Sequence, residues 1–304
     1  MTDRRSVWSI ASRLVPRGFK SRAKRFVRET ADSSAIERRL AELDGEIAAL
    51  RSRLADAETA AGQWASLLRR EAALPPPPPP HLQIRVAGKY APGFFDSAAE
   101  ACREVDVALG AAGRSLSDFE AILDFGCGPG RAIRILRALA PGARLFGCDI
   151  DPEAIAWARS HYASYGDFSV APHHPPTLYP EGRFDLIVGI SVFTHLPEDM
   201  QLEWLAELRR IARPGAFLVL TTHGEEHYGK LDADVREIMR TRGFFYGDFG
   251  WNYGRSVSLP DFYQTAYHSH DYIRREWSRF FEIVDIRALG LEKHQDTVLL
   301  RRPG

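Results

Sequence analysis

Cysteine and long apolar runs are both scarce in this chain. Its 304 residues include three cysteines, Cys102, Cys127 and Cys148. An odd number without metal-ligand spacing argues against a disulfide framework and against a zinc site. No stretch reaches the roughly 20 apolar residues that a helix needs to cross a bilayer, and residues 1–30 lack the apolar core of a secretory signal. We therefore expect a cytoplasmic protein that binds no metal.

Net charge is also absent, because 40 basic residues balance 40 acidic ones. The distribution is uneven, and residues 1–30 form a basic arm in which Lys and Arg outnumber Asp and Glu. Apolar residues are interspersed there, so the arm suits either an amphipathic helix on an anionic membrane surface or a flexible tail. Pro16 and Gly18 interrupt any single helix and favour the tail. Peripheral contact with the inner membrane surface remains the alternative.

Residues 31–74 carry an apolar stripe at alternating steps of four and three, the heptad pattern of a coiled coil. The stripe runs through Ile36, Leu40, Leu43, Ile47, Leu50, Leu54, Ala57, Ala61, Trp64 and Leu68. In a parallel dimer, pairs of opposite charge would face each other: Arg39 with Asp44, Glu46 with Arg51, and Arg53 with Glu58. We predict a homodimer through this segment. A long helix packed on its own globular domain is the alternative, supported by Gly45 and Gly62.

An uninterrupted proline run, residues 75–80, separates this segment from the rest of the chain. Proline has no backbone N–H and favours an extended polyproline helix, which makes the run a stiff spacer. It lacks the flanking basic residues that would favour an SH3-type ligand. The globular domain then covers residues 81–304.

Short apolar runs alternate with helical patterns in this domain. A helix is expected over 95–109, and strands are expected over 121–125, 144–149, 167–171, 184–190 and 215–222. Such alternation predicts an α/β fold with a doubly wound, mostly parallel sheet. A ligand should then lie beyond the carboxyl ends of the strands.

The most informative segment is AILDFGCGPGR, residues 121–131. Its glycines, at 126, 128 and 130, remove side chains where a loop turns sharply and approaches a ligand, and the following helix offers free N–H groups. Asp149, at the end of the next strand, can accept both hydroxyls of a ribose. The pattern predicts a nucleoside site. Arg131 stands where a dinucleotide fold needs its third glycine, which disfavours NAD and FAD.

Four segments in sequence order resemble the class I S-adenosylmethionine-dependent methyltransferases, and the resemblance covers roughly residues 82–304. They are ILDFGCGPGR (122–131), GCDIDPEAIAWA (147–158), FDLIVGISVFTHL (184–196) and LAELRRIARPGAFLVLTTHG (205–224). The nearest likeness is to bacterial methyltransferases linked to polysaccharide and glycan modification. It implies a Rossmann-like fold closed by an antiparallel hairpin, for which the apolar runs 281–286 and 297–300 are the candidates.

The resemblance implies S-adenosylmethionine as the cofactor. The loop residues Gly126, Cys127, Gly128 and Gly130 would then pass under its methionine portion. Asp124 and Arg131 would flank the amino and carboxylate ends of that portion.

The resemblance also assigns the nucleoside end. Asp149 would bind the ribose, Ile150 would cover one adenine face, and Ser191 would approach the methionine amino group through its backbone. Family members often place an acid or an amide after the third strand, whereas this chain has APHH at 171–174. That segment is therefore left out of the predicted site.

The expected acceptor is a hydroxyl of a small molecule or saccharide. Its proton must leave as the oxygen attacks, and a histidine suits that task near neutral pH. We predict His195, in the loop after the fourth strand, as the base. The alternative is that His195 caps the following helix or packs beneath the cofactor, in which case His223 or Tyr228 takes the role.

Aromatic residues interleaved with glycines fill residues 244–267. Such a segment suits a lid whose rings stack on an acceptor, and a satellite core under a long loop is the competing interpretation. Because the segment is not basic, we expect no nucleic-acid partner. Two other functions are alternatives to the methyltransferase interpretation. One is an inactive scaffold that acts through its coiled coil, and the other is an NAD-linked oxidoreductase, which Arg131 disfavours.

Overall fold

The computed structural model describes residues 41–43, 45–47, 76–87, 94–247 and 260–304. Its contacts divide the chain into two units, 1–72 and 73–304. In the first unit, the described residues are helical. The predicted basic arm and most of the predicted coiled coil lie outside the described residues, so both stay predictions.

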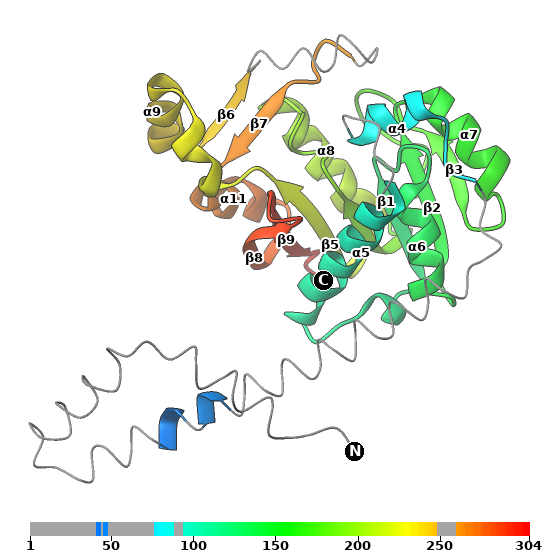
Figure 1. The fold of residues 1–304 in the computed structure, drawn as a ribbon, viewed down its shortest axis with the longest axis horizontal. Helices are drawn as coiled ribbons and strands as arrows, with labels where there is room; N and C mark the ends of the chain where they lie inside the picture. Colours follow the sequence, from blue (N-terminus) through cyan, green and yellow to red (C-terminus); the bar gives the residue numbers. More distant parts are fainter. Residues whose placement is uncertain (1–40, 44, 48–75, 88–93, 248–259) are drawn as a thin grey trace, which may run out of the picture. The chain divides into compact units, whose positions relative to one another are not determined.

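The second unit is an α/β domain (Figure 1). Among its described residues, seven strands form one sheet in the order β3-β2-β1-β4-β5-β9-β8. Their bounds are β1 Ala121–Phe125, β2 Arg144–Asp149, β3 Asp167–Val170, β4 Phe184–Gly189, β5 Ala212–Thr222, β8 Glu282–Leu291 and β9 Gln295–Arg301. Strands β1 to β5 run parallel, and β9 pairs antiparallel with both β5 and β8. The predicted parallel sheet and its closing antiparallel hairpin are confirmed.

Two strand boundaries differ from the sequence prediction. Strand β5 begins at Ala212, three residues before the expected start, because its first part continues directly from the preceding helix and pairs with Phe184. Strand β8 extends to Leu291 through two irregularities in its register with β9. Bulges of this kind hide a strand from a strict alternation pattern.

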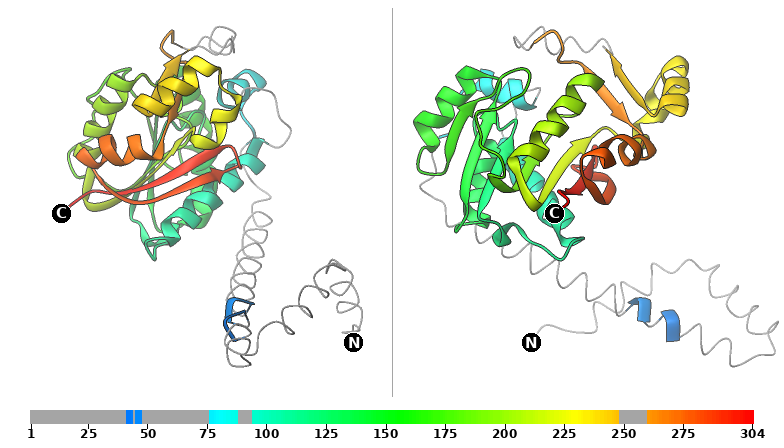
Figure 2. Two further views of the ribbon diagram at one scale, coloured as in Figure 1. Left: turned by 90° about the vertical axis from the view of Figure 1, so that its left-hand side faces the viewer. Right: turned by 180° about the vertical axis from the view of Figure 1, so that it is seen from behind.

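Helices cover both faces of the sheet (Figure 2). Helices α6 (Arg131–Leu139) and α7 (Pro152–Tyr162) lead from β1 to β2 and from β2 to β3, whereas α8 (Glu198–Ile211) leads from β4 to β5 in the opposite direction along the sheet. Right-handed crossovers therefore place α8 on the face opposite to α6 and α7. Helix α5 (Phe94–Gly110) packs against α6 and completes that face.

The start of α7 shows how local sequence determines a helix boundary. Asp151 is the N-cap, and its carboxylate accepts hydrogen bonds from the backbone N–H groups of Glu153 and Ala154. Pro152 occupies the first turn, where its missing N–H costs nothing. The same carboxylate keeps its other oxygen for a partner outside the helix.

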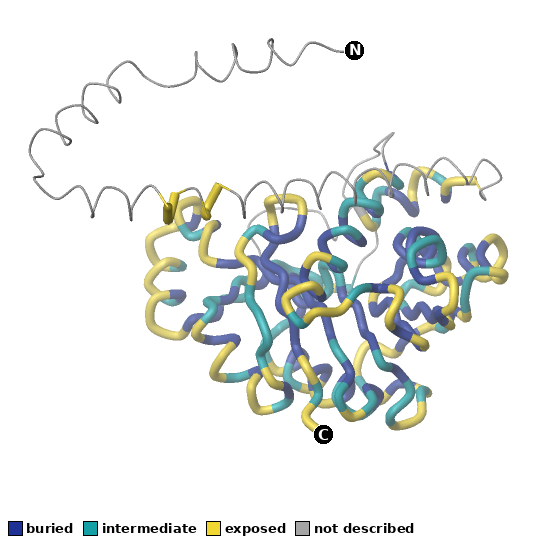
Figure 3. Tube along the Cα trace, turned by 90° about the horizontal axis from the view of Figure 1, so that it is seen from below, coloured by how far each residue is buried: buried dark blue, intermediate teal, exposed yellow. Residues whose placement is uncertain are grey.

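The central strands form the core, as the burial colouring of Figure 3 shows. All five residues of β1 are buried, as expected for a parallel strand covered on both faces. Leu123 pairs with Phe146 on one side and with Ile187 on the other. Behind β4, the rings of Phe193 and Trp277 pack 5.2 Å apart, and both side chains are fully buried.

The remaining elements form a smaller layer beyond β5. They are η2 Glu225–Lys230, α9 Ala233–Arg242, β6 Phe244–Gly247, β7 Thr265–His268, α11 His270–Glu276 and η3 Trp277–Arg279. Two short elements lie elsewhere: α4 Pro80–Ala87 precedes the sheet, and η1 Leu116–Asp118 contacts α5 and α6. Strands β6 and β7 form a separate antiparallel pair. None of the helices in the described part of the chain is long and apolar enough to span a membrane.

The aromatic segment is therefore only partly a candidate lid. Phe244 is buried in the core and lies 5.1 Å from the ring of Tyr272, and Tyr246 packs against the same cluster. In β6 and β7, Phe244 and Ala266 belong to the main hydrophobic core, so these residues form neither a lid nor a separate satellite core. The middle of the segment, 248–259, lies outside the described residues.

We expect Phe193→Ala to lower the free energy of unfolding by about 3–5 kcal/mol, because a fully buried ring leaves a cavity beside Trp277. Urea unfolding followed by fluorescence measures this. The matched control is Leu178→Ala, at a side chain that is 99% exposed, and it should leave the stability within about 0.5 kcal/mol of the original. Equal stability of the two variants would contradict the core assignment.

Candidate functional site

A cavity in the described part of the chain lies where the connections of the sheet change direction. The chain leaves β1 toward β2 and leaves β4 toward β5. The connections that follow these two neighbouring strands therefore run in opposite directions along the sheet. Residues at the ends of β1 and β2 and after β4 line the cavity. Open α/β sheets bind ligands at this switch point.

The glycine loop after β1 adopts a backbone that other residues rarely take. Gly126 and Gly130 have φ values of 82° and 83°, and Gly128 has 52°. A Cβ on Gly126 would lie 2.3 Å from Val192, and one on Gly128 would lie 2.8 Å from Val86. Each glycine is therefore required both by its torsion angle and by the space around it.

Asp149 connects this loop to the end of β2. Its carboxylate accepts hydrogen bonds from the N–H groups of Gly128, at 2.7 Å, and of Asp151, at 2.9 Å. Burial raises the pKa of Asp149, while these hydrogen bonds oppose the shift. Each carboxylate oxygen keeps a lone pair that can accept a ribose hydroxyl.

Asp124 is a buried acid at the floor of the cavity. Its side chain is 3% exposed, and its Oδ2 has no hydrogen-bond partner among the described residues. Burial, together with the charge of Asp149, raises the pKa of Asp124 to about 7, although Arg131 opposes the shift. A buried carboxylate without a partner favours a cationic ligand group beside it.

Arg131 also lines the cavity, and its guanidinium is held in place. It donates to the hydroxyl of Ser97 at 2.7 Å and lies 5.4 Å from the ring centre of Phe94. A guanidinium in a fixed position suits a ligand carboxylate. At the predicted methionine end, the cavity thus offers a carboxyl group, that of Asp124, and a cationic guanidinium, that of Arg131.

Comparisons with known proteins agree with this geometry. Residues 123–218 match a family model described as a methyltransferase domain. Residues 123–218 of this chain therefore form a methyltransferase domain. Among curated proteins, the probable methyltransferase ltbC of Aspergillus luteorubrus is 28% identical over 38% of this chain and 45% of its own length. Trans-aconitate 2-methyltransferase of Mycobacterium tuberculosis is 28% identical over 47% of this chain and 52% of its own.

Among solved structures, human N-acetylserotonin methyltransferase in complex with SAM is similar at a TM-score of 0.48 and 19% identity, over 74% of this chain and 56% of that one. This chain spans about half the length of the curated relatives reported above. The family match identifies the methyltransferase domain at residues 123–218 and does not identify the acceptor or the activity of the whole protein.

Eight of the nine predicted cofactor residues line the cavity of the methyltransferase domain. They are Asp124, Gly126, Cys127, Gly128, Arg131, Asp149, Ile150 and Ser191. Gly130 is the exception. It is the N-cap of α6, and a Cβ there would lie 2.9 Å from Tyr162, so this glycine is required for helix packing rather than for the cavity wall.

Ser191 reaches the cavity with an unusual backbone. Its φ of 59° is rare for a residue with a side chain, and its N–H donates to the hydroxyl of Thr221 at 2.7 Å. Its side chain bonds the amide of Gln295. The predicted backbone contact with an amino group must therefore come from the carbonyl of Ser191.

Sequence reasoning missed two groups of lining residues. Ala171 and His173 line the cavity, although the absence of an acid or amide excluded their segment from the prediction; the strand order brings them there because β3 neighbours β2. Leu82, Arg85 and Val86 come from α4, an eight-residue helix too short for a clear sequence signal. Phe262 and Tyr263 are the part of the aromatic segment that reaches the cavity.

His195 is adjacent to the cavity but does not line it. Its Nδ1 donates to the carbonyl of Gln264 at 2.8 Å, and its ring stacks on Tyr263 at 4.0 Å. The Nδ1 donor leaves the lone pair on Nε2. Burial lowers the pKa of His195 to about 4, although the bond to Gln264 opposes this. The helix-cap alternative is wrong, because the N-cap of α8 is Pro197 and has no side-chain cap bond.

The two substitutes for His195 differ in chemistry. Burial, strengthened by the neighbouring histidines, lowers the pKa of His223 to about 3, and its Nδ1 donates to the carbonyl of Ala266. Burial raises the pKa of the Tyr228 hydroxyl, so this group keeps its proton near neutral pH and is a poor base. Among the described residues, no group of three or more His, Cys, Asp or Glu is placed to hold a metal ion.

Affinity for S-adenosylhomocysteine, which also carries an ammonium group, should rise between pH 6 and pH 8. Below the pKa of Asp124, about 7, the carboxyl is protonated and loses its attraction for the ammonium; above it, the affinity reaches a plateau. We expect Asp124→Asn to weaken binding by about tenfold at pH 8 and to flatten the profile. Calorimetry at several pH values measures both. A variant with the original pH profile would contradict this role of Asp124.

Proposed function

We propose that the whole chain is an active methyltransferase that transfers a methyl group from S-adenosylmethionine to a hydroxyl oxygen of a small molecule or saccharide. The observation that carries this proposal is the unpartnered, buried carboxylate of Asp124 beside the glycine loop. Such a group is costly to bury unless a ligand compensates for it, and an inactive scaffold gains nothing from it.

Different residues of the cavity can bind different parts of the cofactor. Asp124 and the carbonyl of Ser191 would hold the ammonium group, and Arg131 would hold the carboxylate. Asp149 would accept the ribose hydroxyls. When bound, S-adenosylmethionine supplies an electrophilic methyl group on a cationic sulfur. The protein contributes alignment of the attacking oxygen with that methyl group and exclusion of water.

His195 is the proposed base for the acceptor hydroxyl. The bond from Nδ1 to Gln264 fixes the ring and its tautomer, so that Nε2 can accept a proton. A pKa of about 4 makes the imidazole a weak base in the empty site, but one that is neutral and ready at any pH above about 5. Tyr263, which stacks on His195 and also lines the cavity, joins the two regions.

The acceptor is proposed from several weaker lines of support. Phe262 and Tyr263 offer ring faces on which a sugar or a planar molecule can stack. The name of the M. tuberculosis relative refers to a small organic acid, which supports a small molecule as acceptor. The resemblance to glycan-modifying enzymes supports a saccharide. We expect no nucleic acid as substrate, because the aromatic segment is not basic.

The segment before the methyltransferase domain is proposed to recruit partners. The heptad pattern of residues 31–74 supports a coiled-coil homodimer. The basic composition of residues 1–30 supports a cytoplasmic protein that makes peripheral contact with the inner surface of the membrane. An inactive scaffold that acts through this coiled coil is the alternative function. It differs from the enzyme in one measurable property, binding of the cofactor.

The full chain should bind S-adenosylhomocysteine with a dissociation constant in the micromolar range, about −8 kcal/mol at 1 μM. Titration calorimetry measures it, with NAD as the control ligand, which should give no heat. Absence of binding at millimolar S-adenosylhomocysteine would support the scaffold instead. Tighter binding of NAD would support the oxidoreductase.

His195→Ala should lower turnover by roughly 10² to 10⁴ while leaving the affinity for S-adenosylhomocysteine within about twofold. Turnover is measured as S-adenosylhomocysteine release with a panel of saccharides and small hydroxylated, carboxylated and phenolic molecules. At saturating S-adenosylmethionine, the rate of the unmodified enzyme should not fall between pH 8 and pH 6, because His195 stays neutral there and the protonation of Asp124 no longer limits binding. An alanine variant with full activity would remove His195 as the base and direct attention to His223.

A further inference from the structure

Helix α4 forms one wall of the cofactor cavity. Leu82, Arg85 and Val86 all line it. Val86 lies so close to the glycine loop that a Cβ on Gly128 would be 2.8 Å from its Cγ2. The cofactor cavity is thus enclosed by a helix that stands outside the sheet and its crossovers.

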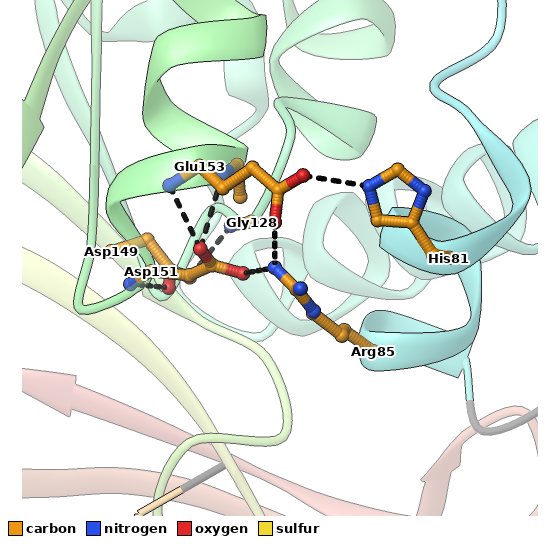
Figure 4. Close-up of polar contacts among 7 residues, drawn as sticks. His81, Arg85, Gly128, Asp149, Asp151 and Glu153 are labelled. Atoms are coloured by element: carbon orange, nitrogen blue, oxygen red, sulfur yellow. Dashed lines mark hydrogen bonds and ion pairs between the residues drawn. The ribbon is translucent and has the colours of Figure 1, made fainter. Parts of the chain in front are cut away.

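A set of ion pairs attaches this helix to the start of α7 (Figure 4). The Nη1 of Arg85 lies 2.8 Å from Asp151 and 2.7 Å from Glu153. His81, one turn earlier, bonds the other oxygen of Glu153 at 2.8 Å. We call Arg85, Asp151 and Glu153 the α4 latch.

The α4 latch differs from an ordinary surface ion pair. Exposed pairs contribute little to stability, and Glu153 is 53% exposed. The pair between Arg85 and Asp151 is more enclosed, since these side chains are only 23% and 17% exposed. One guanidinium nitrogen serves two carboxylates that would otherwise repel each other. The geometry therefore favours a defined position of α4 over a loosely held one.

The α4 latch is also connected to the predicted ribose ligand. Asp151 binds Arg85 with Oδ2 and caps α7 with Oδ1, while its own N–H donates to Asp149. Asp149 in turn accepts the N–H of Gly128. A continuous set of hydrogen bonds thus runs from α4 through Asp151 and Asp149 to the glycine loop.

The segment before α4 supports the same position. Pro78 is buried, and its carbonyl accepts a hydrogen bond at 2.7 Å from the side chain of Gln83, which is also buried. The carbonyl of Pro79 accepts the N–H groups of Leu82 and Gln83. The end of the proline run and α4 are thus joined by three hydrogen bonds.

We propose that Arg85 is a positioning residue for the methyl donor: through the α4 latch it holds α4 over the cofactor cavity and keeps Asp149 in place for the ribose. This inference rests on the proposed function. It assigns a task in cofactor binding to a segment outside the family motifs, and it makes one wall of the cavity depend on one guanidinium.

The test compares four versions of the full chain, the original, Arg85→Gln, Arg85→Lys and Arg240→Gln. Arg240 is the matched control, because it forms an exposed ion pair with Glu237 on α9. Calorimetry with S-adenosylhomocysteine measures affinity. Labelling with N-ethylmaleimide, followed by peptide mass spectrometry, measures access to Cys127, a buried thiol that lines the cavity.

We expect Arg85→Gln to weaken binding by about tenfold and to accelerate labelling of Cys127 by a similar factor in the absence of ligand. Arg85→Lys should stay within about threefold of the original, because one ammonium can meet both carboxylates as Nη1 does. Arg240→Gln should change neither quantity. A general loss of stability would accelerate labelling of Cys102, which is buried but does not line the cavity, as well as labelling of Cys127. Loss of the α4 position alone should accelerate labelling of Cys127 and leave Cys102 unchanged.

Two results would overturn the inference, original affinity in Arg85→Gln or unchanged labelling of Cys127. Should Arg85→Gln fail to fold, Glu153→Gln takes its place, since Glu153 is half exposed, and it should shift both quantities in the same direction. If the unmodified chain does not bind S-adenosylhomocysteine, the proposed function is rejected. That outcome differs from one in which the unmodified chain binds and the Arg85 variants show no effect, which would reject only the role of the α4 latch.

Discussion

The structure of the cofactor site depends on the attachment of the glycine loop to the end of β2. The N–H groups of Gly126 and Cys127 both donate to the carbonyl of Cys148, at 2.8 and 3.0 Å, and the N–H of Gly128 donates to Asp149. These bonds hold the loop in a left-handed conformation that only glycine adopts without strain. They also place the predicted ribose acid directly beside the loop, so the two halves of the site share one scaffold.

Most of the fold could be predicted because its signals are local. Buried parallel strands read as apolar runs, and the predicted start of each strand from β1 to β4 agrees with the structure. The position of Asp124 and Asp149 at the cavity could be predicted for the same reason, since both stand at or next to the ends of strands. The start of β5 and the bulged end of β8 could not be predicted, because pairing with neighbouring strands determines these boundaries and the alternation of apolar residues does not.

The missed parts of the site are those that tertiary structure assembles. Arg85 carries no motif, and its importance arises only when α4 lies against α7. His173 was excluded on the residue type expected after β3, whereas its position next to β2 brings it to the cavity. The aromatic segment was overinterpreted as a lid, because aromatic composition alone does not distinguish a ring in a core, such as Phe244, from one at a cavity, such as Tyr263.

Burial has opposite effects on the two kinds of titratable group at this site. It raises the pKa of Asp124 to about 7 and lowers the pKa of His195 to about 4. Low dielectric surroundings penalise whichever form is charged, so each group shifts toward neutrality when no ligand compensates. A cationic ligand reverses this balance at Asp124, because the carboxylate is then paired. The same exclusion of water that makes these groups costly to charge is what methyl transfer requires, and Arg85, by holding α4 closed, would maintain it.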